Sequence, residues 1–337
     1  MPELRRVLDW RIAAAALLAF VCGLGVGLSL APDSGRQQVT ALTPVPPPLP
    51  ARAARAAAPP APPASLDAIA PAAGPPAAAV GPPRPIRPEQ RGEQAPWRRY
   101  AVAAPARAGR AAVAVVLDDL GLDRRRTARA IGLPGPLTLS FLPYAGELAQ
   151  QAEAGRRAGH ELMLHLPMEA ESQRISPGPN ALRTGLDPAE LLDLLAWNLG
   201  RFNGYVGVNN HMGSRFTADA RGMRTVLAEL ERRGLMFLDS RTSAHTVGYR
   251  LGAELGLPVA QRDVFLDNVL TADRVNDQLA EVERIAKRHG QAIAIGHPHD
   301  ATLDALAEWL PHLEARGLVL VPITALVRPP AHVQAKG

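Results

Sequence analysis

The chain has 337 residues, 47% of them hydrophobic, so it is long enough to bury a large core. Most of its 33 prolines lie in the first third of the sequence, as do many of the arginines behind the formal net charge of +5. This uneven composition indicates one folded domain after that region. Basic residues do not alternate with aromatics, so we expect no nucleic-acid partner, and the single cysteine, Cys22, excludes an internal disulfide and a cysteine-based zinc cluster.

The first 31 residues have the composition of a membrane anchor. Residues 12–31 form an uncharged apolar run long enough to span a bilayer, and Arg5, Arg6 and Arg11 precede it. This asymmetry predicts a bacterial inner-membrane protein with a cytoplasmic amino terminus and a periplasmic folded domain. Cleavage as a signal peptide would instead release a secreted protein. A lipoprotein at Cys22 is the least favoured alternative, because Val21 is larger than the small residue expected there.

Residues 32–108 are rich in alanine and proline, as in AAAPPAPPA, and predict a disordered linker. Proline at this density does not sustain helices or central strands and favours extended, solvated backbone. The linker is either a semi-rigid spacer or a plain tether. We place the folded domain at residues 109–330 and a disordered tail at residues 331–337.

Strands and helices alternate through the folded domain. The apolar run at residues 113–117 is typical of a strand buried on both faces. Similar runs predict strands at 137–142, 161–164, 205–208, 235–238, 259–266, 292–295 and 318–321. Helical spacing is found between them at 124–131, 147–158, 188–202, 220–233, 247–255, 275–288 and 302–315. This alternation predicts an α/β fold with a parallel sheet, and it favours a distorted (β/α) barrel of about seven strands.

Two common chemistries lack their sequence signatures. Neither glycine-rich pattern of nucleotide-binding loops follows the first strand. The GxSxG pattern of serine hydrolases is also absent. The sequence therefore gives no support to nucleotide binding or to hydrolysis by a nucleophilic serine.

Polar residues directly follow five of the predicted strands. They are Asp118 and Asp119; His165; Asn209, Asn210 and His211; Asp239 and Ser240; and His297 and His299. The carboxyl ends of barrel strands converge on one face, so we expect these side chains to meet in one pocket. Taken singly, each has a structural explanation: His165 as a buried histidine, Asp239 as a helix cap and Asn209 as a turn residue. One shared site explains all five strand ends at once.

These residue types suit metal-assisted hydrolysis. Histidine nitrogens and carboxylate oxygens bind divalent ions such as zinc. Such an ion lowers the pKa of bound water and polarises a carbonyl group. Successive strand residues point to opposite faces, so Asp118 and Asp119 are expected to differ in orientation, one binding the metal and the other accepting a proton. A histidine on the opposite wall would protonate the leaving group.

Six sequence blocks resemble those of a known enzyme family. LDD and GHELMLH resemble the first two signatures of NodB-homology polysaccharide deacetylases. The closer resemblance, over residues 111–327, is to the divergent polysaccharide deacetylase family, through the blocks VVLDDLG, ELMLHLPME, GVNNHMGSRFT, FLDSRTS, RDVFLDN and AIGHPHDATL. The resemblance implies a distorted (β/α) barrel that removes acyl groups from carbohydrate.

The resemblance also implies roles for individual residues. Asp118 matches the general base, whereas Asp119 and the first histidine of the second motif, His165, match metal ligands. Four residues later, where NodB-type enzymes have a second histidine, this chain has Glu169. The third ligand is therefore either Glu169 or His211 from the neighbouring strand end.

The remaining strand-end residues are expected to supply the acid and the substrate-binding groups. His297 and His299 match the histidine of the last motif, the candidate acid, although the pair can also be interpreted as metal-binding. The arginine of the third NodB motif is not found, and the NNHMGS stretch stands in its place. We assign substrate binding to Asn209, Asn210, Asp239 and Ser240.

The sequence thus favours an envelope enzyme that uses a divalent metal ion, zinc above others, to deacylate a polysaccharide or peptidoglycan-type carbohydrate. Its expected partners are a carbohydrate polymer or oligosaccharide and, through the amino-terminal helix, the membrane. The alternative is a barrel that binds a glycan or a protein without hydrolysing it. The missing second histidine and the missing arginine motivate that alternative.

Overall fold

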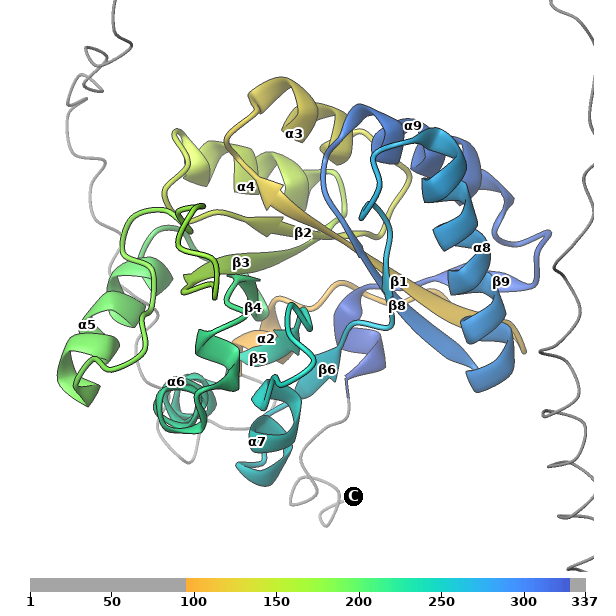
Figure 1. Ribbon diagram of the computed structural model, residues 1–337. Coiled ribbons are helices and arrows are strands. Elements are labelled where there is room, and N and C mark those ends of the chain that lie inside the picture. Colours follow the sequence, from red (N-terminus) through yellow and green to blue (C-terminus); the bar gives the residue numbers. More distant parts are fainter. Residues whose placement is uncertain (1–94, 328–337) are drawn as a thin grey trace, which may run out of the picture. The chain divides into compact units, whose positions relative to one another are not determined.

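The computed structural model describes residues 95–327 (Figure 1). The predicted anchor, the first part of the predicted linker and the predicted tail lie outside the described residues. Within residues 95–327, no helix combines the length and the apolar character needed to cross a membrane. The end of the predicted linker contacts the domain: a short helix, α2 (Pro96–Arg99), lies there, and Trp97 and Tyr100 pack against buried apolar side chains.

Nine parallel strands form one sheet in the described part of the chain. They are β1 (Ala111–Leu120), β2 (Thr138–Phe141), β3 (Glu161–Met168), β4 (Gly207–Met212), β5 (Met236–Asp239), β6 (Val259–Gln261), β7 (Val264–Phe265), β8 (Gln291–Gly296) and β9 (Leu318–Leu320). Their order is β6-β5-β4-β3-β2-β1-β8-β7, and β9 pairs with the start of β1. Each of the eight predicted strand regions contains a strand, so the prediction of an α/β fold with a parallel sheet is confirmed.

The sheet curls until its two ends approach each other. β6 pairs with β5 and β7 pairs with β8, although only Arg262 and Asp263 separate these two strands in the chain. The Arg262 N–H donates to Asp239 O, and the Asp263 N–H donates to Ile293 O. The single strand predicted at residues 259–266 is therefore divided in two, because the chain changes partners within it. This curled sheet is consistent with the predicted distorted (β/α) barrel.

Helices surround the outside of the curled sheet (Figure 1). They are α3 (Arg124–Ile131), α4 (Leu148–Arg157), α5 (Pro188–Leu199), α6 (Ala220–Arg232), α7 (Gly248–Glu254), α8 (Ala272–His289) and α9 (Asp300–Trp309), with 3₁₀ turns at η2 (Phe216–Ala218), η3 (Leu310–His312) and η4 (Ile323–Leu326). Three of them begin at an aspartate whose side chain accepts backbone N–H groups of the first turn: Asp123, Asp187 and Asp219. Such caps satisfy donors that the helix itself leaves unpaired.

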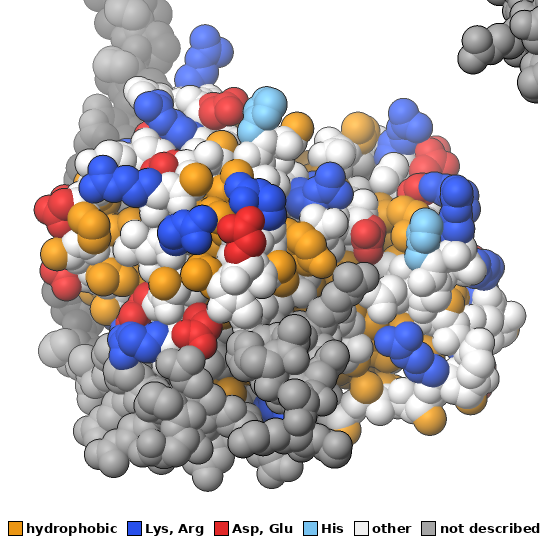
Figure 2. Space-filling view, turned by 90° about the horizontal axis from the view of Figure 1, so that it is seen from below, with side chains coloured by type: hydrophobic (Ala, Val, Ile, Leu, Met, Phe, Trp, Pro, Cys, Tyr) orange, Lys and Arg blue, Asp and Glu red, His pale blue; other side chains and the backbone are white. Residues whose placement is uncertain are grey.

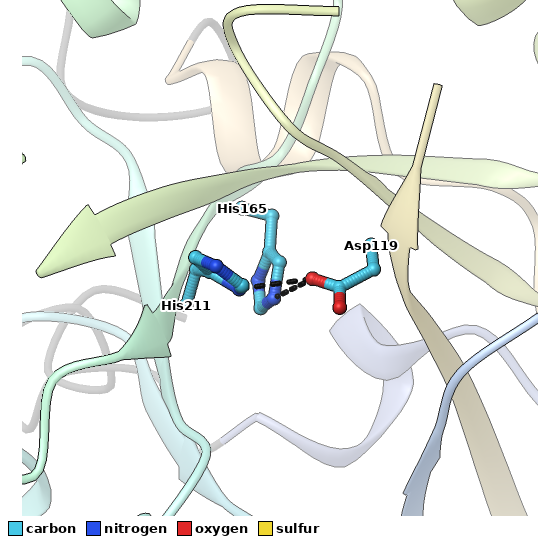
Figure 3. Close-up of side chains that lie close together, drawn as sticks. All are labelled: Asp119, His165 and His211. Atoms are coloured by element: carbon cyan, nitrogen blue, oxygen red, sulfur yellow. Dashed lines mark ion pairs between the residues drawn. The ribbon is translucent and has the colours of Figure 1, made fainter. Parts of the chain in front are cut away.

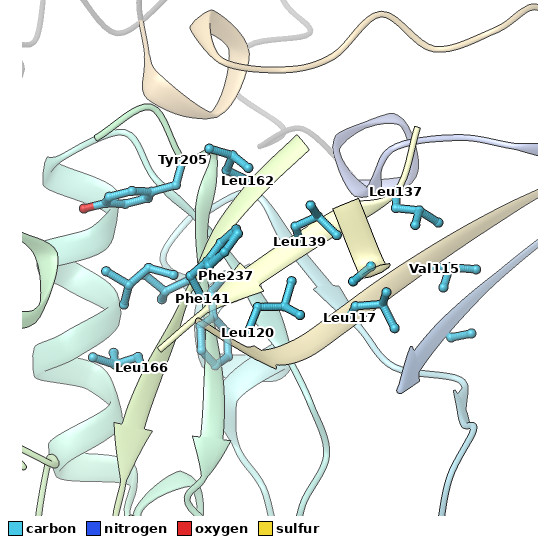
Figure 4. Close-up of a cluster of buried hydrophobic side chains, with 14 of the residues drawn as sticks. Val115, Leu117, Leu120, Leu137, Leu139, Phe141, Leu162, Leu166, Tyr205 and Phe237 are labelled. Carbon is cyan, nitrogen blue, oxygen red and sulfur yellow. The ribbon is translucent and has the colours of Figure 1, made fainter. Parts of the chain in front are cut away.

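The two faces of the strands bury two separate apolar clusters. On β1, Val113, Val115 and Leu117 join the outer cluster, which includes residues of the surrounding helices. Figure 4 shows Val115 and Leu117 within this cluster. The alternate residues join an inner cluster that η4 covers; they are Ala112, Ala114 and Val116. The strand period of two therefore continues the inner face of β1 from Val116 to Asp118. Apolar side chains thus fill one end of the interior, and polar side chains occupy the other.

Candidate metal centre

A pocket of about 500 Å³ lies at the carboxyl ends of the strands. Side chains from the carboxyl-terminal halves of β1, β3 and β4, and from the residues that directly follow β5 and β8, line it. They include Asp118, Asp119, His165, Asn210, His211, Ser240 and His297. The sequence predicted polar residues after these five strands. The structure extends β1, β3 and β4 through theirs, so of the residues just named only Ser240 and His297 lie after their strands. Their convergence follows from the parallel sheet, in which all carboxyl ends lie at one edge.

Asp119, His165 and His211 point toward one another in this pocket (Figure 3). Asp119 Oδ1 lies 2.9 Å from His211 Nδ1 and 3.2 Å from His165 Nε2. One potential ligand atom from each residue lies within 4.8 Å of the other two. Ligand atoms around a tetrahedral zinc ion are about 3.3 Å apart, given bonds near 2.0–2.1 Å. The three side chains therefore have the spacing of a metal-ligand set.

Asp119 Oδ1 is the atom whose surroundings most clearly indicate a cation-binding site. It is buried, and its polar neighbours among the described residues are the ring nitrogens of His165 and His211, neither of which is aligned as a regular hydrogen bond to it. Buried polar atoms nearly always have well-aligned partners, so a buried carboxylate oxygen between two poorly aligned ring nitrogens needs an explanation. Burial by itself raises the pKa of Asp119, but His165 and His211 outweigh it and hold the pKa well below its usual value. The group is thus an ionised carboxylate beside two histidines, and this donor set fits a divalent metal ion.

The backbone of Asp119 brings both aspartates into the same pocket. Its φ is +57°, in the left-handed region, and the pairing register of β1 shifts between Leu117 and Leu120. At this bulge, successive side chains no longer point to opposite faces of the sheet as they do in an ordinary strand. The expectation that Asp118 and Asp119 point in different directions is therefore wrong, because both side chains line the pocket.

Asn209 connects Asp118 to His165 behind the pocket. Its Nδ2 donates to both oxygens of Asp118, at 2.8 and 3.0 Å, and lies 3.2 Å from Ser240 Oγ. Its Oδ1 accepts from Ser140 Oγ at 2.6 Å and lies 3.0 Å from His165 Nδ1. An acceptor at Nδ1 fixes a proton there and leaves Nε2 free to bind a metal. Asn209 thus orients the candidate base and one candidate ligand together.

Asp118 is buried and carries a carboxylate with a shifted pKa. Burial raises its pKa above the usual value, although His165, His297 and the hydrogen bond from Asn209 act in the opposite direction. His165 lies between the carboxylates of Asp118 and Asp119. Burial by itself lowers the pKa of the His165 ring, but the two carboxylates outweigh burial and raise it. A proton and a metal ion therefore compete for His165 Nε2.

His297 lies on the opposite side of Asp119, paired with Asp267. Its Nδ1 is 3.0 Å from Asp267 Oδ1, and its Nε2 is 3.8 Å from Asp119 Oδ2. Burial lowers the pKa of His297, but Asp267 and then the other two aspartates outweigh it and raise the pKa to about 9. Asp267 is not among the predicted site residues, although it directly follows a predicted strand and lies within the RDVFLDN block. The same strand-end signal would have found it.

His299 joins Asp267 and His297 in a second group of potential ligands. Both oxygens of Asp267 already accept hydrogen bonds: the N–H of His297 (2.6 Å) and the hydroxyl of Thr302 (2.9 Å) bind Oδ2, and His297 Nδ1 faces Oδ1. This saturation favours an orienting role for Asp267 over a metal site. Of the two histidines, His297 lines the pocket, whereas His299 precedes α9 as its first flanking residue.

Glu169 lies apart from the proposed ligands. Its Oε2 accepts hydrogen bonds from the N–H and the hydroxyl of Thr184, at 2.7 and 2.8 Å, and its Oε1 lies 3.7 Å from Arg215. It belongs to neither group of potential metal ligands within residues 95–327. Of the two alternatives for a third ligand, the structure brings His211 to Asp119 and leaves Glu169 in the loop that follows β3.

The four residues expected to bind substrate lie in different surroundings. Ser240 and Asn210 line the pocket, whereas Asn209 lies behind it. Asn210 is also used within the fold: its Oδ1 accepts the N–H of Ser240 at 2.9 Å. Asp239 is fully buried and is not part of the pocket wall; it accepts hydrogen bonds from the Thr246 hydroxyl, from the Tyr249 N–H at the start of α7 and from the Arg241 N–H after β5. Its position matches the helix-cap alternative.

Comparison with known proteins agrees with the sequence blocks. The sequence model described as divergent polysaccharide deacetylase matches residues 115–327. The uncharacterized protein YibQ of Escherichia coli K12 is 32% identical over 230 residues, covering 68% of this chain and 71% of that protein. An uncharacterized protein of Haemophilus influenzae is 31% identical over 202 residues, which are 60% of this chain and 71% of that protein.

A solved structure extends the similarity to the fold. The uncharacterized protein ATU2773 from Agrobacterium tumefaciens C58 superposes with a TM-score of 0.70 at 30% identity, covering 74% of this chain and 100% of that chain. The family match spans the region from β1 to η4, which contains the curled sheet and the candidate site. This chain therefore belongs to the divergent polysaccharide deacetylase family.

Proposed function

We propose that this protein is a metal-dependent hydrolase that removes acyl groups, acetyl above others, from a carbohydrate polymer or oligosaccharide of the cell envelope. The observation that carries the proposal is the buried Oδ1 of Asp119, which faces ring nitrogens of both His165 and His211. A buried base and a histidine with a raised pKa stand beside it in one pocket. These are the parts that metal-assisted acyl transfer requires.

Asp119, His165 and His211 would hold the metal ion, for which zinc is our proposal. When bound, such an ion lowers the pKa of a water molecule toward neutrality and polarises the acyl carbonyl. Asp119 supplies an anionic oxygen, and Asn209 holds His165 with Nε2 facing the pocket.

Asp118 acts as the base in this proposal. The amide of Asn209 holds both of its oxygens, so the carboxylate keeps one orientation. Burial raises its pKa, which strengthens it as a proton acceptor. Asp118 takes the proton of the attacking water.

His297 acts as the acid. Its pKa of about 9 keeps the ring protonated at neutral pH. Asp267 binds Nδ1 and thereby turns Nε2 toward the pocket. His297 gives its proton to the leaving amine or alcohol of the sugar.

A binding barrel without hydrolysis is the weaker candidate. The missing second histidine of the NodB pattern motivated it, but His211 lies 2.9 Å from the Asp119 carboxylate and offers a third ligand atom. Asn209 holds the buried Asp118, so the absence of the NodB arginine leaves no unpaired base. Both observations support hydrolysis.

The location in the envelope, with the membrane as a partner, is proposed from the sequence of residues 1–31. A nucleic-acid partner is not part of the proposal. On the face shown in Figure 2, basic and acidic side chains are interspersed with apolar ones. Nucleic-acid binding is instead associated with a basic patch or stripe.

Acetate release tests the proposed function. Zinc-loaded wild-type protein is expected to release acetate from acetylated chito-oligosaccharides or from peptidoglycan. Asp118→Asn should reduce the rate at least about a hundredfold, since general base catalysis contributes a factor of that order. Asp277→Asn removes an exposed carboxylate from the outer helix α8 and is the matched control. Equal release by wild type and Asp118→Asn would overturn the assignment of the base.

A further inference from the structure

Two arginines stand on the wall of the same pocket as the candidate metal ligands. Arg241 follows β5, and Arg262 lies in the short segment between β6 and β7. The pocket is lined by two carboxylates, Asp118 and Asp119, and both already face histidines or Asn209. The wall therefore carries two guanidinium charges that the metal centre does not use.

Arg262 is half-buried and held in place by backbone carbonyls. Its Nε donates to Ser240 O at 2.7 Å, and its Nη2 donates to Arg241 O at 2.9 Å. The guanidinium lies 5.0 Å from the centre of the Phe265 ring, and that ring lies 5.3 Å from the ring of His297. Arg262 is thus separated from the candidate acid by one aromatic side chain.

Arg241 has a backbone conformation that is unusual for its residue type. Its φ is +51°, in the left-handed region, and its N–H donates to Asp239 Oδ1 at 2.9 Å. Asp119 and Met212, which also line this pocket at strand ends, have φ values of +57° and +52°. Such conformations in non-glycine residues persist where the surrounding structure imposes them, commonly at functional sites.

Neither arginine forms an ion pair with a carboxylate of residues 95–327. The side chain of Arg241 makes one long contact, from Nη1 to Arg262 O at 3.5 Å. Asp263, the chain neighbour of Arg262, uses its Oδ2 to accept the N–H of Ile293 at 2.8 Å. The half-buried guanidinium group of Arg262 and the exposed one of Arg241 repel each other. An anion between them would remove this repulsion and would gain charge-assisted hydrogen bonds.

We propose that Arg241 and Arg262 form a subsite for a carboxylate of the glycan, so that the acylated sugar or its neighbour in the polymer is an acidic sugar. The carboxylate lies on the His297 side of the pocket, while the acyl group faces the metal ligands. The glycan identity of the ligand rests on the proposed function, whereas the anionic subsite rests on the arginines alone. A planar, bidentate guanidinium group suits a carboxylate particularly well.

Calorimetric titration of the full chain tests the subsite without turnover, in an Asp118→Asn background. Three probes are compared: neutral chitotetraose; a tetrasaccharide of N-acetylglucosamine and N-acetylmuramic acid, whose carboxylate is on the acylated sugar; and a hyaluronan tetrasaccharide, whose carboxylate is on the neighbouring sugar. At least one acidic probe is expected to bind about tenfold or more tightly than chitotetraose, and added salt should reduce the difference. The acidic probe that binds more tightly shows which sugar carries the charge.

Substitutions then connect the preference to the pocket. Arg241→Gln should remove most of the preference and Arg241→Lys should retain part of it. Arg274→Gln, which removes an exposed charge from α8, should leave the preference unchanged. The proposal is overturned if chitotetraose binds as tightly as both acidic probes, or if Arg241→Gln keeps the full preference. If the protein prefers acidic probes but the wild type releases no acetate, the proposed hydrolase function is contradicted and the anionic subsite is supported. If the wild type releases acetate but shows no preference for acidic probes, the subsite is contradicted and the hydrolase function is supported.

Discussion

Asp119 shows how one backbone angle determines the chemistry available at the end of β1. An extended residue at this position would direct its side chain toward the outer face, which Leu117 occupies. With φ at +57°, the carboxylate instead faces His165 and His211. Aspartate tolerates this conformation better than most residues, because its short polar side chain can bond locally. The result is a base and a ligand next to each other in sequence and in space.

At the residue scale, the first prediction concerns the third metal ligand. His211→Ala should weaken zinc binding at least about a hundredfold, because it removes one of three ligand atoms. Glu169→Ala should bind zinc as the wild type does, because the Glu169 carboxylate bonds to Thr184 in the loop. Competition with a chromophoric chelator measures both affinities. Zinc loss in Glu169→Ala together with retention in His211→Ala would reverse the assignment.

The second prediction concerns Asp267 as a positioning residue for His297. The Asp267 carboxylate helps to raise the pKa of His297 to about 9, so activity should decline as the pH rises through this range and the acid loses its proton. In Asp267→Asn the alkaline limb of kcat/KM should move to lower pH by about one unit or more. Asp304→Asn, on the exposed side of α9, is the control. A lower kcat with an unmoved limb would indicate a purely structural role.

At the scale of elements, Glu161 joins three parts of the chain at the closed end of the interior. It begins β3 and is fully buried. Its carboxylate accepts hydrogen bonds from the hydroxyl and the N–H of Thr324 in η4, and from the N–H of Val102. Burial outweighs these bonds and raises the pKa of Glu161 to about 7. The fold therefore favours the protonated form of this group.

The third prediction follows from that shift. A carboxyl group with a pKa of 4.5 in the unfolded chain and about 7 in the fold reduces stability as the pH rises between these values. The full effect is about 3 kcal/mol and is complete above pH 7. Glu161→Gln should remove this pH-dependent loss of stability. The free energy of unfolding of the variant, relative to that of the wild type, should therefore be greater at pH 8 than at pH 5. Urea denaturation at both pH values measures this, with exposed Glu314→Gln as the control. Equal pH dependence of the wild type and Glu161→Gln would contradict the assignment.

At the scale of the whole described domain, the candidate ligands come from three different strands. Asp119, His165 and His211 belong to β1, β3 and β4, so a bound ion connects regions that are far apart in sequence. The unfolded chain does not bring these atoms together, and metal binding therefore stabilises the folded state. Surface ion pairs such as Arg110–Glu314 contribute much less per pair, because their charges are hydrated.

The fourth prediction is a metal-dependent melting temperature. Free zinc at about a hundred times its dissociation constant should stabilise the fold by about 2.7 kcal/mol. For a domain of this size, that corresponds to a rise of about 5–10 °C in Tm, reversible by a chelator. In His211→Ala the rise should be less than about 2 °C at the same zinc concentration. Differential scanning calorimetry measures it, and an equal rise in both proteins would exclude these residues as the site.

The amino-acid sequence by itself determined the α/β class, the positions of the strands and the family. Apolar runs, helical spacing and strand-end polar residues are local patterns, and local patterns specify which face of each element is buried. They also predicted that Asp118, His165 and His297 would lie at the same edge of the sheet. This much follows from parallel strands alone.

Only the tertiary structure decided which of those side chains meet. It turned Asp119 into the pocket, brought His211 rather than Glu169 to it, and placed Asp239 under α7. It also joined Asp267 to His297 across β7 and β8. These outcomes depend on strand register, on one left-handed residue and on contacts between segments that are distant in the chain, which neither periodicity nor motif spacing encodes.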